Sequence, residues 1–231
     1  MQYMGGKVRI SKYLVPVLQE RLKDKDTFVD LFCGSCNIVS AIKAPNRIAN
    51  DLHKELIALH KAVQSGWVPP SVVTEEEYKQ AKEQEDHLKA FIGFGCSFSG
   101  KYFGGYARNK RGDNYAKQNS NSLIRKHTTM KDVKFCNYFY ADVVLPDNSL
   151  VYCDIPYKGT TEYSTTSFLH EEFYFWCKDM KDKGHDIIVS EYLCNVPKGW
   201  EVVWKHESKK DMRNKEGEQE GTVEVLMTPN N

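Results

Sequence analysis

The sequence predicts an α/β fold built on a mostly parallel, doubly wound sheet. Short apolar runs typical of buried strands alternate with stretches of helical periodicity near both ends of the chain. The alternation stops between residues 68 and 130, where the chain is first helical, then glycine-rich, and then basic and polar. At 231 residues the chain exceeds the commonest size of one domain, so we expect one α/β domain that carries residues 68–130 as an insertion.

The first half of the chain supplies two strands and two helices to this scheme. Residues 27–32 read TFVDLF, which is typical of a buried strand, and residues 47–50 form a short second strand. Residues 53–63 place apolar side chains at helical spacing, and a Pro-Pro pair ends that helix. Thr74 begins the next helix, because Glu77 follows it in the spacing of a capping box.

The second half returns to the alternating pattern. Residues 170–183 have the periodicity of an amphipathic helix, which Gly184 ends. Further apolar runs predict strands over residues 133–140, 149–154, 186–191, 200–204 and 221–227.

Composition excludes several classes of protein. With 41% hydrophobic residues the chain is too apolar to be wholly disordered. No window approaches 18 uninterrupted apolar residues, as a transmembrane helix would require. The first residues lack the apolar segment of a secretory signal, so we expect a cytoplasmic protein. The seven cysteines lie mostly in apolar runs, as reduced and buried thiols do.

Charge is distributed unevenly, although the net charge is only +1. Residues 101–134 carry nine Lys or Arg against two Asp, a net of +7, while residues 75–86 carry six acids against two lysines. Glycines and aromatics are interleaved with the basic residues at 101–108, which read KYFGGYAR. Basic groups neutralise phosphates and aromatic side chains contact bases, so nucleic-acid binding and a solvated basic face are both open interpretations.

A first candidate site follows the strand at residues 28–32. The strand runs into a Gly/Ser turn and an expected helix, which is where open α/β sheets bind ligands. Gly34 lets a ligand approach the backbone, and the helix N-terminus offers free amides. Asp51 follows the next strand at the place of a ribose-binding acid in dinucleotide folds. Asp51 could equally cap the helix that begins near His53, and the two roles are compatible.

A second candidate site ends the strand at residues 149–154. The strand stops at Asp154, and Ile155, Pro156 and Tyr157 follow. A carboxylate and outward carbonyls can accept the hydrogens of an exocyclic amine, and an aromatic ring can stack on a planar base. A strand-ending turn capped by an aspartate is the alternative.

Six motifs occur in one order along the chain: YMGGK at 3–7, DLFCGS at 30–35, NDL at 50–52, FGGYAR at 103–108, DIPY at 154–157 and VSEY at 189–192. Together they resemble the Dam-like, alpha-group DNA adenine-N6 methyltransferases, which use S-adenosylmethionine (SAM). The resemblance runs from residue 2 to about residue 205. It implies a Rossmann-like, SAM-dependent methyltransferase sheet formed by residues 1–67 and 131–231, with residues 68–130 as an inserted, mainly helical DNA-recognition region.

The resemblance also implies roles for motif residues in binding SAM. Tyr3 and Lys7 match the segment that closes over SAM, with Lys7 near the methionine carboxylate. Asp51 matches the acid that binds the ribose hydroxyls, and Asp142 resembles the acid that reads the adenine ring of SAM. The implied cofactor-binding residues are Tyr3, Gly6, Lys7, Asp30, Phe32, Gly34, Asp51, Asp142 and Asp154.

The DIPY motif matches the family's D-P-P-Y, so Asp154, Ile155, Pro156 and Tyr157 are the implied catalytic residues. Asp154 would accept a hydrogen bond from the target amine, and Tyr157 would stack on the flipped base. Acceptors on the amine hydrogens direct the nitrogen lone pair toward the sulfonium methyl, so direct displacement needs no metal and no covalent intermediate. Ile155 replaces a family proline, which keeps the carbonyl but makes the turn less rigid, so reduced turnover or altered base tolerance is expected.

The resemblance implies double-stranded DNA as the partner, which the basic region would contact. Arg and Asn suit the edges of guanine and adenine. The expected DNA-binding residues are Lys101, Tyr106, Arg108, Asn109, Lys110, Arg111, Asn114 and Tyr163. Cys33 and Cys36 have no Cys or His partners nearby in the sequence, so we expect no metal.

Two rival functions stay open. One is a methyltransferase that acts on RNA or on a protein amide; the basic region and Asp154 argue against the protein version. The other is a DNA-binding relative that has become catalytically weak through Ile155. We expect a monomer or weak dimer without a membrane partner, in the cytoplasm of a bacterium or a phage-infected host. A restriction partner, an orphan regulator and phage self-protection are all compatible, and the short chain favours a stand-alone enzyme.

Overall fold

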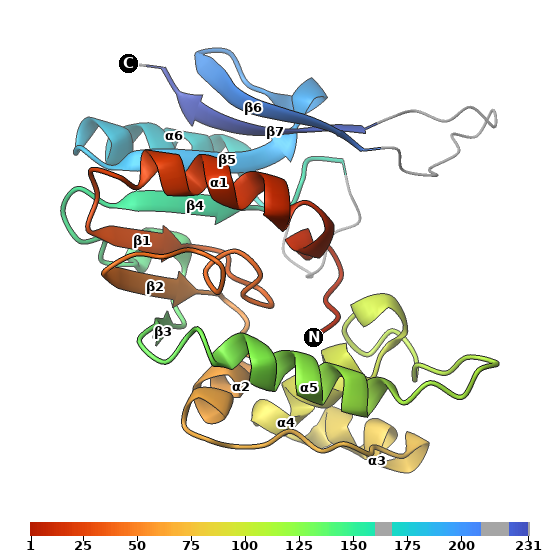
Figure 1. The fold of residues 1–231 in the computed structure, drawn as a ribbon. Helices are drawn as coiled ribbons and strands as arrows, with labels where there is room; N and C mark the ends of the chain where they lie inside the picture. Colours follow the sequence, from red (N-terminus) through yellow and green to blue (C-terminus); the bar gives the residue numbers. More distant parts are fainter. Residues whose placement is uncertain (160–167, 209–221, 231) are drawn as a thin grey trace, which may run out of the picture.

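A computed structural model of the chain describes residues 1–159, 168–208 and 222–230. Its centre is one seven-stranded sheet of order β3-β2-β1-β4-β5-β7-β6 (Figure 1). β3, β2, β1, β4 and β5 are parallel, whereas β7 is antiparallel to both β5 and β6. The strands are β1 (Thr27–Asp30), β2 (Asn46–Asn50), β3 (Lys134–Cys136), β4 (Leu150–Asp154), β5 (Asp186–Tyr192), β6 (Trp200–Ser208) and β7 (Thr222–Pro229). The predicted α/β class with a mostly parallel sheet is confirmed.

Helices cover both faces of the sheet, because neighbouring residues of each strand point to opposite sides. Phe28 of β1 belongs to the core cluster under α1 (Ser11–Arg21), and Val29 belongs to the cluster under α6 (His170–Asp182). Figure 1 shows these two helices on opposite sides of the strands. The five parallel strands are therefore buried on both faces, and their carboxyl ends meet at one edge of the sheet.

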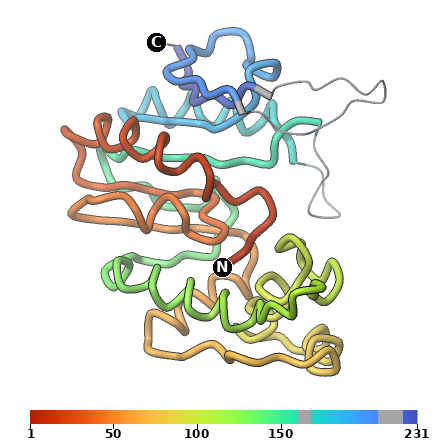
Figure 2. Tube along the Cα trace, turned by 45° about the vertical axis from the view of Figure 1, so that its right-hand side comes forward, coloured from red at the N-terminus to blue at the C-terminus, as the bar shows by residue number. Residues whose placement is uncertain are grey.

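The remaining α-helices form a helical lobe, residues 54–127, beyond the β3 side of the sheet (Figures 1 and 2). Its core is a third cluster, which includes Leu56, Leu59, Phe91 and Leu123 together with Met1 from the N-terminal segment. The lobe helices are α2 (Lys54–Gln64), α3 (Glu75–Gln80), α4 (His87–Ala90) and α5 (Tyr115–His127). Because α2 precedes residue 68 and yet packs in this lobe, the division of the chain at residues 67 and 130 stays a prediction.

Local sequence signals are visible in these elements. Glu77 N donates to the Thr74 hydroxyl at 3.1 Å, and Thr74 N donates to the Glu77 carboxylate at 2.7 Å, so the predicted capping box is present. The strand predicted over residues 133–140 is shorter. β3 ends at Cys136 because Asn137 turns its side chain to the carbonyls of Asp51 and Leu52. In the described part of the chain, no helix has the length and apolarity needed to cross a membrane.

Candidate active site

The predicted motifs converge at the carboxyl edge of the sheet. β1 leads into the loop of residues 31–42, β2 leads into Asp51, and β4 ends at Asp154. The N-terminal segment crosses the same edge, since Met4 N donates to Gly100 O at 3.1 Å and Gly6 N donates to Tyr3 O at 3.1 Å. Segments far apart in the sequence therefore build one site, next to the helical lobe.

Gly34 lies where the loop after β1 and the N-terminal segment touch. Its φ is +46°, and a Cβ at this position would lie 2.9 Å from the Tyr3 ring. Gly34 N donates to the Asp51 carboxylate at 2.9 Å. The Gly34 carbonyl lies 2.9 Å from His60 Nε2, which must be the donor because a carbonyl only accepts. Tyr3, Gly34 and Asp51 are thus brought together as the motifs predict.

Side chains of the helical lobe also hold this loop. Lys126 Nζ donates to Ser35 O and, at 2.6 Å, to Asn37 Oδ1. Burial lowers the pKa of Lys126 to about 8. His60 Nδ1 lies 3.1 Å from His127 Nε2, and burial lowers the pKa of His127 to about 3, so His127 is neutral. The sequence does not single out Lys126 or His127, since one is among nine basic residues and the other carries no motif.

The helix expected after Gly34 is not formed; the chain makes a series of turns. Cys36 has a φ of 58°, which is outside the helical region. The carbonyls of Val39 and Ile42 accept from Arg47 Nη1 at 3.1 and 3.2 Å. These carbonyls are therefore bonded to a neighbouring strand and not to a continuing helix.

Asp30 and Phe32 lie beneath the loop. Asp30 is 2% exposed, and one of its oxygens accepts from Val39 N at 3.3 Å, while the other has no partner within the described residues. Burial raises the pKa of Asp30 well above its usual value. Phe32 packs against aromatic rings, with centroid distances of 6.0 Å to Tyr140 and 5.7 Å to Phe173.

Asp51 and Asp142 occupy different surroundings. Asp51 accepts from Gly34 N and, with its second oxygen, from His53 N at 2.9 Å, so it does approach the start of α2 as the alternative interpretation expected. The helix cap itself is His53. Asp142 is exposed at the end of a short 3-10 helix, Tyr140–Asp142, and the structure records no side-chain partner for it within the described residues.

Lys7, Asp154 and Glu224 form a buried charge cluster on the other side of the site. Lys7 Nζ lies 2.8 Å from Asp154 Oδ1 and 3.0 Å from Glu224 Oε1. The same ammonium lies 4.3 Å from the centre of the Tyr157 ring, and the Tyr157 hydroxyl donates to Glu224 Oε1. The resemblance placed Lys7 at the methionine carboxylate of SAM, whereas the structure pairs it with these two carboxylates.

Burial sets the protonation of this cluster. It raises the pKa of Asp154 to about 6, despite the opposing effect of Lys7. Burial alone would lower the pKa of Lys7, but the carboxylates of Asp154 and Glu224 outweigh it and raise that pKa. Lys7 therefore stays an ammonium while Asp154 titrates near neutrality. Asp154 keeps 19% of its side chain exposed, so it remains accessible to a substrate.

The DIPY turn is braced on both sides of its centre. His170 Nε2 donates to Pro156 O at 2.9 Å, and Ile155, which is 3% exposed, packs in the core cluster under α6. Glu191 is fully buried and accepts from Lys158 N at 3.1 Å. Asn195 completes the brace by donating to Glu191 at 3.1 Å and to Lys158 O at 3.0 Å. The structure thus fixes a turn that lacks the family's first proline.

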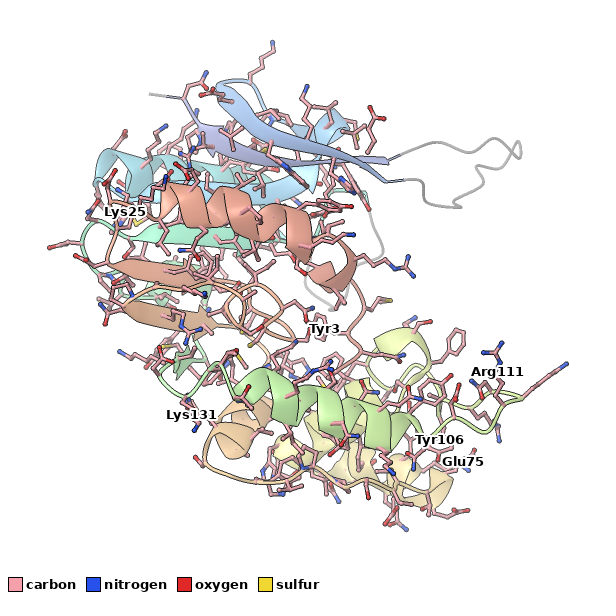
Figure 3. All side chains as sticks on the ribbon, in the orientation of Figure 1. Tyr3, Lys25, Glu75, Tyr106, Arg111 and Lys131 are labelled. Atoms are coloured by element: carbon pink, nitrogen blue, oxygen red, sulfur yellow. The ribbon has the colours of Figure 1, made fainter. Side chains whose placement is uncertain are left out.

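The expected DNA-binding residues between Lys101 and Asn114 belong to the outer end of the helical lobe, but several are engaged within it. Tyr106 donates to Val73 O at 2.7 Å, and Arg108 lies 3.2 Å from Glu75 (Figure 3). Asn109 and Asn114 hold the loop, donating to Asp113 at 2.6 Å and to Ser71 O at 3.0 Å.

Three basic residues of the predicted DNA-binding set differ from these four residues. Lys101, Lys110 and Arg111 are exposed and have no ion pair within the described residues. Figure 3 labels Arg111 on the loop that leads into the start of α5. Tyr163 lies outside the described residues. Within the described ranges, the structure contains no group of three or more His, Cys, Asp or Glu that could hold a metal ion.

The sequence of this chain is similar to those of known DNA methyltransferases. Residues 3–93 match the D12 class N6 adenine-specific DNA methyltransferases. The type II methyltransferase M.FokI of Planomicrobium okeanokoites is 26% identical over 190 residues, which are 70% of this chain and 29% of that protein. The modification methylase StsI of Streptococcus sanguinis is 22% identical over 194 residues, with the same shares of the two chains. The chain thus spans less than a third of the length of these relatives.

A solved structure shows a looser likeness. The candidate methyltransferase yhhF of Escherichia coli is 13% identical, with a TM-score of 0.41, and the match covers 96% of this chain and 86% of that one. The family assignment therefore depends on the sequence matches. They support the resemblance to N6 adenine-specific DNA methyltransferases: the chain is similar to the D12 class over residues 3–93, which contain the first three of the six motifs.

Proposed function

We propose that the protein is a site-specific DNA methyltransferase that transfers a methyl group from SAM to the N6 amine of adenine in double-stranded DNA. The observation that carries this proposal is the juxtaposition of two halves of one site. The glycine loop, which contacts Tyr3 and Asp51, lies at the same sheet edge as the partly exposed carboxylate of Asp154 beside Tyr157.

The residues of the loop fit SAM. Gly34 lets the Tyr3 ring lie against the backbone of the loop, where a Cβ would approach the ring to 2.9 Å, and the buried Asp30 has an oxygen without a partner in the described part of the chain. Such an oxygen suits the amino group or the sulfonium charge of the cofactor. We propose that Tyr3, Gly6, Asp30, Phe32, Gly34, Asp51 and Asp142 bind SAM. When bound, SAM supplies a methyl group on a sulfonium that can be displaced directly.

Asp154, Tyr157 and the backbone of the DIPY turn would hold the adenine. The Asp154 carboxylate accepts one hydrogen of the N6 amine, and the Tyr157 ring stacks on the base. The Pro156 carbonyl is already bonded to His170, so the Ile155 carbonyl is the candidate second acceptor. As the new N–C bond forms and the C–S bond breaks, the amine must shed a proton. Asp154, with its pKa of about 6, is suited to take that proton.

The helical lobe would contact the DNA around the target. Lys101, Lys110 and Arg111 supply exposed positive charge, and Arg108, Asn109, Asn114, Tyr106 and Tyr163 complete the predicted DNA-binding residues. Hydrogen bonds within the loop hold it in one shape, which helps a protein read base edges. We expect this enzyme to act as a monomer or weak dimer in the cytoplasm.

The substrate class can be tested by competition. The protein is incubated with SAM carrying a radioactive methyl group and genomic duplex DNA, and unlabelled RNA or DNA is then added as competitor. We expect label in the duplex, and competition by duplex DNA but not by RNA. Preferential labelling of RNA would favour the rival RNA methyltransferase. Binding of both SAM and DNA without any transfer would favour the catalytically weak relative.

A further inference from the structure

Glu224 is the one member of the Lys7 cluster that none of the sequence motifs includes. It belongs to β7, where it pairs in register with Tyr192 of β5 and His206 of β6. Its side chain is only 13% exposed, so a buried carboxylate has been placed about 70 residues along the chain from Asp154. A buried carboxylate costs free energy unless partners compensate it.

Its partners are the functional groups of the base side of the site. Glu224 Oε1 lies 3.0 Å from Lys7 Nζ and accepts the Tyr157 hydroxyl. Lys7 Nζ is also 2.8 Å from Asp154 Oδ1, so one ammonium forms ion pairs with two carboxylates. The Tyr157 ring is held at its hydroxyl end by Glu224, and the Lys7 ammonium lies 4.3 Å from the ring centre.

We propose that Glu224 is a positioning residue of the base pocket, which fixes the Tyr157 ring through its hydroxyl and shares the Lys7 ammonium with Asp154. This inference rests on the proposed methyl transfer. Glu224 does not touch the adenine in this account. It acts through Tyr157, which stacks on the base, and through Lys7, which pairs with Asp154, the acceptor of the amine hydrogens.

The shared ammonium has a consequence for the charge of Asp154. The charged groups that face Asp154 are Lys7 from the N-terminal segment, Glu224 from β7, Glu191 from β5 and Asp30 from β1, together with the hydroxyls of Tyr152 and Tyr157. Glu224 and Glu191 raise the pKa of Asp154, after burial as the largest cause, while Lys7 lowers it. Removing the charge of Glu224 should therefore lower that pKa.

The decisive variant is Glu224→Gln, because the amide oxygen can still accept the Tyr157 hydroxyl while the negative charge is lost. In the pH profile of kcat/KM for DNA, we expect the acid limb to move to lower pH by about one unit. The matched control is Glu201→Gln on β6, an exposed acid of the neighbouring strand. The control should keep the acid limb of the unsubstituted protein. An acid limb of Glu224→Gln that stays in place, or moves to higher pH, overturns the proposal.

A second experiment tests the contact with Tyr157. Glu224→Ala and Tyr157→Phe should each lower kcat by about tenfold. The double variant should lose no more than the worse single variant, since both changes remove the same hydrogen bond. Losses that multiply to about a hundredfold would contradict the account. Lys7 keeps Asp154 as its partner in each variant, and thermal unfolding confirms that the variants are folded.

The outcomes separate this inference from the proposed function. If the unsubstituted protein binds SAM but methylates no DNA, the proposed function has failed. If the protein methylates adenine and the Glu224 variants leave both the pH profile and the coupling to Tyr157 unchanged, only the role of Glu224 has failed. Calorimetric binding of SAM should be the same in all these variants within about threefold, because Glu224 lies on the base side of the site.

Discussion

The two sides of the site are held by different forces. The glycine loop on the cofactor side is fixed through its backbone: Asp51 accepts from Gly34 N, His60 donates to Gly34 O, and Lys126 donates to Ser35 O. The base side is fixed through side-chain charges, with the Lys7 ammonium between the carboxylates of Asp154 and Glu224. The contacts on the cofactor side therefore fix the conformation of the loop, whereas those on the base side set the protonation state of Asp154.

This difference predicts which property, SAM binding or turnover, each substitution should alter. In these contacts the loop supplies backbone groups, which do not titrate, and the ammonium of Lys126, with a pKa of about 8, stays charged as the pH falls, so the loop should keep its affinity for SAM. A carboxylate with a pKa of about 6 titrates close to neutrality, so methyl transfer should depend on pH. Changes on the loop should thus alter SAM binding, and changes on the base side should alter turnover.

The largest expected effect comes from removing the acceptor on the base side. Asp154→Ala should lower kcat/KM for DNA by about 1,000-fold, because the target amine loses its charged acceptor. Calorimetry should still find SAM bound with an affinity within about threefold of the unsubstituted protein. Full activity in this variant would show that the catalytic carboxylate lies elsewhere.

A glycine substitution tests the cofactor side. Gly34→Ala places a Cβ 2.9 Å from the Tyr3 ring, so we expect SAM affinity to fall by about tenfold. Gly66→Ala is the matched control, because Gly66 also has a positive φ, +98°, and its Cβ would meet nothing within 4 Å. Both variants should lose about 1 to 2 kcal/mol of folding free energy from backbone strain. Equal SAM affinities in the two variants would contradict the role given to the packing of Tyr3 on Gly34.

The pH dependence separates the two sides within the unsubstituted protein. kcat/KM for DNA should fall as the pH drops through about 6, and should be about tenfold lower at pH 5, because protonated Asp154 cannot take up the proton that the amine must lose. SAM affinity measured by calorimetry should stay flat over the same range. A SAM affinity that falls in parallel with activity would place the titrating group on the cofactor side.

The same titration has the opposite effect on stability. The pKa of Asp154 is raised from 3.8 to about 6 by folding, so its protonation stabilises the folded state. That contribution is complete below pH 3.8 and is lost as the pH rises through about 6. Between pH 4 and 6, activity and the contribution of Asp154 to the free energy of unfolding should therefore change in opposite directions. Chemical unfolding of the protein and of Asp154→Asn over this pH range measures that contribution.

The smallest effect is expected on the loop before α5, which we propose contacts DNA. Arg111→Ala should weaken duplex binding by about threefold and lower the slope of log K against log salt by about one. Arg108→Ala also removes one positive charge from this loop, but Arg108 already has a partner in Glu75 at 3.2 Å. Its effect on the salt dependence should be smaller. If fluorescence anisotropy shows equal slopes for both variants, the exposed charge of Arg111 is not what contacts phosphate.

The parts of the fold that depend on local sequence could be predicted. The apolar residues at helical spacing in residues 53–63 are the buried face of α2, and the Thr74 capping box begins α3. The strands that carry Asp154 and precede Asp51 also lie where their apolar runs predict. α1 was not predicted, since it contains Pro16 and buries only two of its residues.

The parts that depend on long-range contacts could not be predicted. Glu224 reaches Lys7 only because β7 inserts between β5 and β6, and no local pattern specifies that pairing. The turns after Gly34 replace a helix because Arg47 on a neighbouring strand takes the carbonyls of that segment. Lys126 reaches the loop from the helical lobe, and its neighbours in the sequence give no sign of that contact.

The most direct test of the central claim is nucleoside mass spectrometry. The protein and Asp154→Ala are each incubated with duplex DNA and SAM whose methyl group carries a heavy isotope, and the DNA is digested to nucleosides. The account predicts heavy N6-methyladenine from the unsubstituted protein and almost none from Asp154→Ala. Heavy methyl on cytosine alone, or equal heavy N6-methyladenine from both proteins, would contradict it.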